Sequence, residues 1–189
     1  VGDPPQAGPV VGDVVITEIM VNPGGAHQVQ DDDGEWIEIQ NLTERHFSLN
    51  GWSLQDDGSP RSFAFPERGL LEALSTIVVA RSGDRTINGG VIADYITGDA
   101  HRLANEGDRI QLFGPSGELL DEVSWSTPMW PVEPGAALSL DIEARDPRLN
   151  DDPANWCPSP AGIVAGGDRG SPGRDNPSCP KAPPANCSE

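Results

Sequence analysis

The sequence predicts an all-β fold in which two sheets pack face to face as a sandwich. In residues 34–41, strict alternation places Ile37 and Ile39 on one side of a strand and Trp36 and Glu38 on the other. Strand-like runs recur at intervals of roughly ten residues, with turn-forming residues between them. No long segment repeats apolar residues at helical spacing. Together these patterns favour many short strands over helices.

Three runs near the start are predicted to form the heart of the sandwich. Residues 14–20 are rich in β-branched side chains, which favour strands. The alternating run 34–41 follows, and residues 49–54 carry Trp52 beside an Asn50-Gly51 turn signal. We expect Trp52 to lie in the core.

Further strands are expected along the rest of the chain. The run 75–80 is almost continuously apolar, which indicates burial on both faces. The run 137–141 is the last predicted strand. The others are 62–65, 91–96, 109–113 and 118–125.

The chain has 189 residues, enough for one ordinary domain with additional segments. Its 22 glycines and 19 prolines suit short strands joined by turns. We expect a monomeric module of a larger protein, divided into a leader or linker at 1–12, a sandwich at 13–141, a loop-rich extension packed on the domain at 142–180 and a linker at 181–189.

The charge balance disfavours nucleic acid as a partner. The chain carries 12 Lys and Arg against 30 Asp and Glu, a net charge of −18. Such a surface repels phosphate backbones. There is also no run of 18 or more apolar residues, so we expect no membrane insertion.

Three cysteines, Cys157, Cys179 and Cys187, lie near the C-terminus without the CxxC spacing of a zinc site. A Cys157–Cys179 disulfide would fix the extension and stabilise the fold by roughly 3 kcal/mol. Cys187 would then pair with a cysteine outside this sequence, or it would pair with Cys157 in place of Cys179. A disulfide implies an oxidising compartment, and hence a secreted or surface-displayed protein. Three free thiols in the cytosol are the alternative.

Clustered carboxylates raise a calcium hypothesis. Asp31, Asp32, Asp33 and Glu35, joined by Glu18, could supply several of the six to eight oxygens that Ca²⁺ prefers. The EF-hand pattern is absent, because neither alternate acidic positions nor a closing Glu is present. The alternative is a set of solvated acidic loops. A second candidate set in the extension is Asp146, Asn150, Asp151 and Asp152.

A contact site for a protein or glycan is the other candidate. The loop 126–131 contains Met129 and Trp130, and we expect Trp130 to be partly exposed. An exposed indole can stack on a sugar ring or anchor a protein partner. The alternative is that Trp130 covers a sheet edge.

No catalytic constellation is visible in the sequence. Glu35 and Glu38 fall on opposite faces of one strand, and Glu38 is expected to point outward. No HExxH, Gly-x-Ser-x-Gly or phosphate-loop motif occurs. The isolated histidines, expected in exposed loops, are His27, His46 and His101.

The strand motifs resemble a known family when taken in order. Residues 15–20 and 34–41 resemble the opening of the lamin tail domain, and 49–54 are similar to its central tryptophan strand. The extension, with Asn155-Trp156 and Asn176, looks like that of bacterial members. Segments that continue the match are 63–66, 77–80, 103–112, 117–121 and 170–173.

The resemblance implies an immunoglobulin-like β-sandwich and a non-enzymatic accessory module, which bacteria often attach to secreted or surface proteins. Nuclear lamins add a coiled-coil rod and a basic flank, neither of which the sequence shows, so filament and DNA-binding roles are not expected. The leading hypothesis is therefore a non-catalytic, secreted or cell-surface module that contacts a protein or glycan. The alternatives are a calcium-stabilised adhesion or matrix domain and, third, a hydrolytic enzyme.

Overall fold

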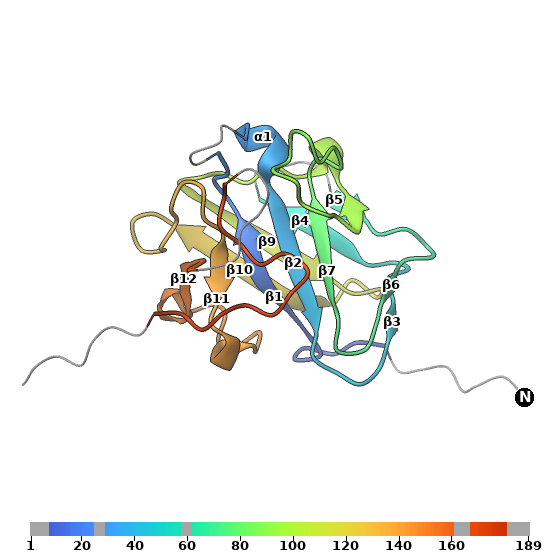
Figure 1. Cartoon of the computed structure of the whole chain (residues 1–189). Helices are drawn as coiled ribbons and strands as arrows, with labels where there is room; N and C mark the ends of the chain where they lie inside the picture. Colours follow the sequence, from blue (N-terminus) through green and yellow to red (C-terminus); the bar gives the residue numbers. More distant parts are fainter. Residues whose placement is uncertain (1–7, 25–28, 58–61, 161–166, 181–189) are drawn as a thin grey trace, which may run out of the picture.

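The computed structural model describes residues 8–24, 29–57, 62–160 and 167–180. Two sheets pack against each other in this part of the chain, with a short two-stranded ribbon beside them (Figure 1). The predicted all-β sandwich is therefore confirmed. The helices in these ranges span only three or four residues each, too short to cross a membrane. They are α1 (Asp31–Gly34), η1 (Gly98–Ala100), η2 (Ile142–Ala144) and η3 (Pro153–Asn155).

The larger sheet has six strands in the order β12-β11-β1-β2-β7-β8. Its pairings are antiparallel apart from the parallel contact between β7 and β8. The strands are β1 (Val14–Met20), β2 (Trp36–Asn41), β7 (Thr76–Ala80), β8 (Tyr95–Ile96), β11 (Leu138–Leu140) and β12 (Trp156–Pro158).

The smaller sheet has four strands in the order β10-β9-β4-β5, all antiparallel. They are β4 (Ser53–Asp56), β5 (Ser62–Ala64), β9 (Gly107–Phe113) and β10 (Leu119–Ser126). The ribbon consists of β3 (Phe47–Ser48) and β6 (Leu70–Leu71). At the turn between β3 and β4, Gly51 has a φ of +82°, a conformation that glycine adopts without strain.

The main core lies between the two larger sheets. Ile37 and Ile39 belong to it, as the alternation predicts, and they share it with Leu54 and Leu112 of the smaller sheet. Trp52 is 1% exposed and its ring centroid lies 6.2 Å from that of Phe47. The expected core position of Trp52 is confirmed.

The outer face of the larger sheet is also covered. Trp36 joins Met20 and Val78 in a second, smaller apolar cluster on this side. Residues 167–179 run across the same face, the red segment in front of β1 and β2 in Figure 1. All residues of β1 and β2 are therefore buried. Glu38 points to the outer face of the sheet, as predicted, but the expectation of an outward, solvent-facing carboxylate is wrong because the covering segment buries it.

The extension contributes a strand of its own. β12 pairs with β11, so the sheet continues beyond the last strand predicted from the sequence. Trp156 at the start of β12 is buried against Trp130, with ring centroids 5.7 Å apart. The segment after residue 141 is thus part of the sandwich as well as a cover for it.

Candidate functional site

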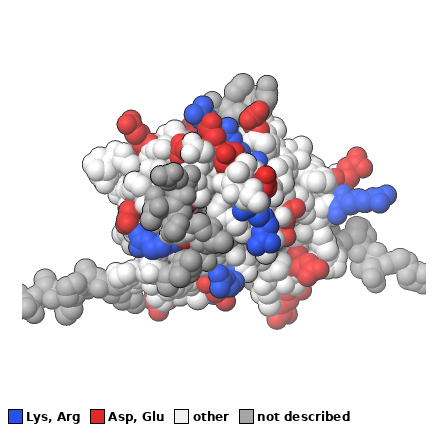
Figure 2. Space-filling view, turned by 45° about the horizontal axis from the view of Figure 1, so that its top comes forward, with Lys and Arg blue, Asp and Glu red and all other residues white. Residues whose placement is uncertain are grey.

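Arg81 organises the acidic end of the sandwich, where α1 meets the end of β7. Its guanidinium lies 2.8 Å from Asp32, 3.3 Å from Glu35 and 3.6 Å from Asp99. Arg102 lies 3.3 Å from Asp32 on the outer side. Figure 2, with the top of Figure 1 turned forward, shows acidic and basic side chains interleaved near this end. The cluster therefore contains its own positive charges.

Glu35 is the buried member of this group. Burial raises the pKa of Glu35 to about 7, while hydrogen bonding to Leu103 and the nearby Arg81 act to lower it. Arg81 also donates its backbone N–H to the Glu35 carbonyl. This side chain is thus held inside the fold and is not displayed to solvent.

The five residues of the first calcium hypothesis do not gather around one point. Asp31 accepts from Asn105, Asp32 and Glu35 pair with Arg81, and Glu18 points to the extension. Asp33 borders an open hollow beside α1. Within the described ranges, no three Asp, Glu, His or Cys side chains are arranged to hold a metal ion. Calcium binding stays a prediction.

The second candidate set is engaged in local contacts. Asp146 pairs with Arg148 at 2.6 Å, and hydrogen bonds from that side chain lower the pKa of Asp146 to about 2. Asn150 is buried and donates to Asp121, and Asp152 caps η3 through the N–H of Ala154. Asp151 is exposed.

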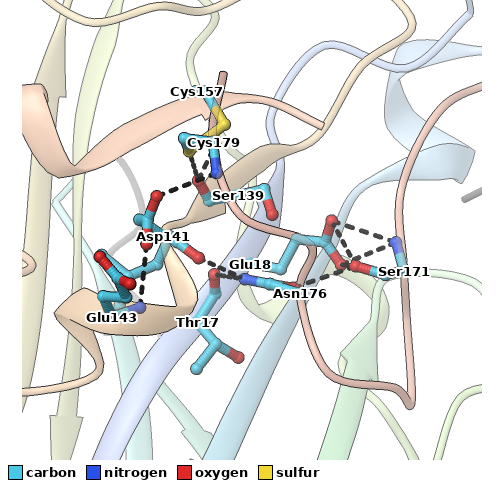
Figure 3. Close-up of a disulfide and its surroundings, with 10 residues drawn as sticks. Thr17, Glu18, Ser139, Asp141, Glu143, Cys157, Ser171, Asn176 and Cys179 are labelled. Atoms are coloured by element: carbon cyan, nitrogen blue, oxygen red, sulfur yellow. Dashed lines mark hydrogen bonds between the residues drawn. A yellow bond between two sulfur atoms is a disulfide. The ribbon is translucent and has the colours of Figure 1, made fainter. Parts of the chain in front are cut away.

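Glu18 and Glu38 bind the extension to the sheet. They lie opposite each other on β1 and β2. Ser171 approaches both carboxyl oxygens of Glu18, through its N–H at 3.0 and 3.1 Å and its hydroxyl at 3.2 Å (Figure 3). Glu38 accepts from the N–H of Gly173 and the hydroxyl of Thr17, each at 2.7 Å. Two acidic side chains thus form the anchor points of residues 167–179.

Burial dominates the electrostatics of this covered face. It raises the pKa of Glu18 to about 8, with a further increase from the neighbouring Glu38. Burial also raises the pKa of Glu38 to about 7, against the hydrogen bonds from Thr17 and Gly173. A strand pattern alone cannot reveal this, because the covering segment lies more than 130 residues further along the chain.

A disulfide closes the extension. The structure joins Cys157 in β12 to Cys179, one of the two pairings that the sequence left open, with a Cα–Cα distance of 5.8 Å (Figure 3). The N–H of Cys179 donates to Asp141 at the end of β11. Cys187 lies outside the described residues.

The two predicted contact residues, Met129 and Trp130, differ in their exposure to solvent. Met129 is 72% exposed, whereas Trp130 is only 7% exposed. The expectation of a partly exposed Trp130 is wrong because its ring packs against Trp156. Met129 alone remains at the surface of this loop.

One histidine prediction is also wrong. His101, directly after η1, is buried, and this burial lowers its pKa to about 4 even though Asp56 acts to raise it. His46 is exposed as expected, and His27 lies outside the described residues. No alternation of apolar and polar residues surrounds His101, so its burial could not be predicted from the sequence.

An open hollow of about 460 Å³ lies between α1 and the connection from β7 to β8. Asp32, Asp33 and Asp99 line it, together with Arg81 and Ile96. The Asp99 side chain is 85% exposed, and Ile96 is 46% exposed. Arg81, Ile96 and Asp99 could not be assigned to this site from the sequence, because no local motif links them to α1.

A family model for the lamin tail domain matches residues 8–127. The chain belongs to the lamin tail domain family. Its sandwich is accordingly immunoglobulin-like, and the family is non-catalytic. No curated protein matches the chain. The matched residues end within the connection from β10 to β11, so β11, β12 and the covering segment lie beyond them.

Proposed function

We propose that this lamin tail domain is a non-catalytic, secreted or surface-displayed module that binds a basic, partly apolar segment of a protein. The observation that carries the proposal is the hollow beside α1, where exposed carboxylates adjoin an exposed isoleucine. The non-catalytic character of the family supports the absence of an enzymatic role.

Charge favours a basic partner. The protein carries a net charge of −18, and the aspartates of the hollow add a local negative potential. Arg81 is bonded to Asp32 and Glu35, whereas Asp99 is mostly exposed beside it. Exposed carboxylates steer cationic groups toward such a surface and fix the register of the complex.

Apolar side chains next to the hollow offer binding area. Ile96 lines the hollow from β8, an edge strand of the larger sheet, and is 46% exposed. Ile92, four residues earlier in the chain, is 69% exposed. Adjoining apolar and charged groups are typical of surfaces that contact proteins. A glycan partner has less support, because no tryptophan exposes its ring for stacking on a sugar. All five tryptophans are buried: Trp36, Trp52, Trp125, Trp130 and Trp156.

The disulfide supports a location outside the cytosol. Cys157–Cys179 would persist in an oxidising compartment and would be reduced in the cytosol. The disulfide would therefore hold the extension in place only in a secreted or surface-displayed protein.

The binding proposal can be tested with a labelled synthetic peptide of alternating Arg and Leu, and its Glu-Leu counterpart. We expect fluorescence anisotropy to detect binding of the first peptide only, weakened by added salt. The variant Asp33→Asn/Asp99→Asn/Ile96→Ser should bind at least about tenfold more weakly, since it removes both kinds of contact.

A matched control makes the same changes elsewhere on the surface. The variant Glu67→Gln/Glu72→Gln/Leu119→Ser removes two charges and one exposed apolar side chain away from the hollow. Its affinity should stay within about twofold of the wild type. Equal losses in the two variants would show non-specific attraction and contradict the proposed site.

A further inference from the structure

The hydrogen bonds around Asn176 fix where one proton must lie. The Nδ2 group of Asn176 lies 2.7 Å from the carbonyl of Thr17 and 3.0 Å from that of Leu140. Both carbonyls only accept, so the amide must present its N–H groups to them. The Oδ1 atom of Asn176 therefore faces the hydroxyl of Ser171 at 3.0 Å (Figure 3).

The Ser171 hydroxyl has a single proton to give. Because Asn176 Oδ1 can only accept, Ser171 donates to it. The same hydroxyl oxygen lies 3.2 Å from both carboxyl oxygens of Glu18. With its own proton already used, Ser171 can only accept in this contact. The donor must then be a protonated Glu18 carboxyl group.

Glu38 has the opposite set of partners. The N–H of Gly173 can only donate to it, and the Thr17 hydroxyl is free to do the same. Above its raised pKa of about 7, Glu38 is ionised and satisfies these donors. Between that pH and about 8 the opposed pair of acids holds one proton, on Glu18, which avoids placing two negative charges side by side in the interior.

We propose that Glu18 is held as a neutral carboxylic acid that donates to Ser171, and that loss of this proton releases residues 167–178 from the sheet. Ionisation breaks the O–H bond and passes the proton to solvent. It leaves carboxylate lone pairs facing the Ser171 oxygen, and a second negative charge opposite Glu38. The disulfide keeps the released segment tethered at Cys179.

Burial and the facing Glu38 favour the neutral form of Glu18. Hydrogen bonds from the Ser171 N–H and from Ser159 act to lower the pKa of Glu18, but burial outweighs them. The next charges are Asp175, which pairs with Arg145 and acts on Glu38, and Asp141 at the end of β11. In the part of the chain that the structure describes, no ion pair joins Glu18 or Glu38 to a basic side chain.

The sign of the pH dependence follows from the raised pKa. The pKa of Glu18 is raised by burial, and next by Glu38, from 4.5 to about 8. The folded state therefore holds this proton more tightly than the unfolded state does. The resulting stabilisation is complete below pH 4.5 and is lost as the pH rises through about 8. The extension should be closed in acid and open in base.

Two measurements test the proposal on the full chain with its disulfide intact. Carboxyl ¹³C NMR should show Glu18 titrating with a midpoint near pH 8, and Glu18→Gln identifies its signal. Trypsin should cut after Arg169, inside the covering segment, only when that segment opens. The cutting rate, corrected for the activity of trypsin on a small substrate, should rise about 30-fold between pH 6.5 and pH 9.5 and should level off above about pH 8.

The variant Glu18→Gln supplies the matched comparison. Its amide can donate to Ser171 and accept from the Ser171 N–H at every pH, so the part of the rise due to Glu18 should disappear. Only the smaller contribution of Glu38, which ends near pH 7, should remain. Glu38→Gln should increase cutting already at pH 7. The carboxylate of Glu38 accepts from Thr17 with one oxygen and from Gly173 with the other, whereas a glutamine amide has only one oxygen that can accept. A Glu18 midpoint near 4.5, or an unchanged rise in Glu18→Gln, would overturn the proposal.

Discussion

The two faces of the larger sheet are both buried, but they are held by different chemistry. The inner face packs Ile37, Ile39 and their neighbours against the smaller sheet through apolar contact. The outer face combines a small cluster around Trp36 with hydrogen bonds from Ser171 and Gly173 to two acids. Apolar burial does not depend on pH, whereas these hydrogen bonds do. The inner face therefore sets the stability of the fold, and the outer face makes one segment responsive to conditions.

The largest expected effect comes from the inner face. Trp52→Ala should lower the free energy of unfolding by about 3–5 kcal/mol, because it removes a buried indole and leaves a cavity. Urea unfolding followed by circular dichroism measures this. A variant as stable as the wild type would show that the main core does not depend on the inner face as described.

Loss of the disulfide should act on the outer face. The double variant Cys157→Ala/Cys179→Ala removes a disulfide that joins residues 22 positions apart in the sequence. It should lower the free energy of unfolding by about 3 kcal/mol. The same urea experiment, run beside wild type with and without reductant, measures the loss. We also expect faster tryptic cutting after Arg169. Unchanged cutting would mean that the extension is held by the sheet alone.

A smaller loss of stability is expected when the hydrogen bonds from Asn176 of the extension to the larger sheet are removed. Asn176→Ala leaves the carbonyls of Thr17 and Leu140 without their donor and should cost about 1–3 kcal/mol. Asn155→Ala, which removes an exposed bond to Leu149, is the control and should change stability by at most about 0.5 kcal/mol. If thermal unfolding shows the same loss of stability for both variants, the buried hydrogen bonds of Asn176 contribute no more to stability than the exposed one of Asn155.

The smallest effect should come from divalent ions. Asp32 and Glu35 are already paired with Arg81, so neither EDTA nor added calcium should shift the melting temperature. Differential scanning fluorimetry with each addition checks this. A marked loss of melting temperature in EDTA that calcium restores would favour the calcium-stabilised alternative.

Strand positions could be predicted where one chain segment carries the whole signal. The β-branched run at β1 and the alternation at β2 mark their own strands, and the continuous apolar run at β7 marks its burial on both sides. Trp52 could be placed in the core for the same reason.

Features that depend on distant segments could not be predicted. Glu38 alternates with apolar residues as a solvent-facing side chain does, and only the segment 135 residues later buries it. β12 is three residues long and forms by pairing with β11, so its own sequence carries little signal. The hollow likewise joins α1 to Arg81 and Ile96 through tertiary contacts alone.

Amide hydrogen exchange at Ser171 and Gly173 tests most directly whether the extension is bound to the outer face of the sheet. Both N–H groups donate to buried acids of the sheet. At pH 6.5 we expect exchange at least about 100-fold slower than in an unstructured peptide, because it requires the extension to open. Exchange at the rate of a free peptide would contradict the account.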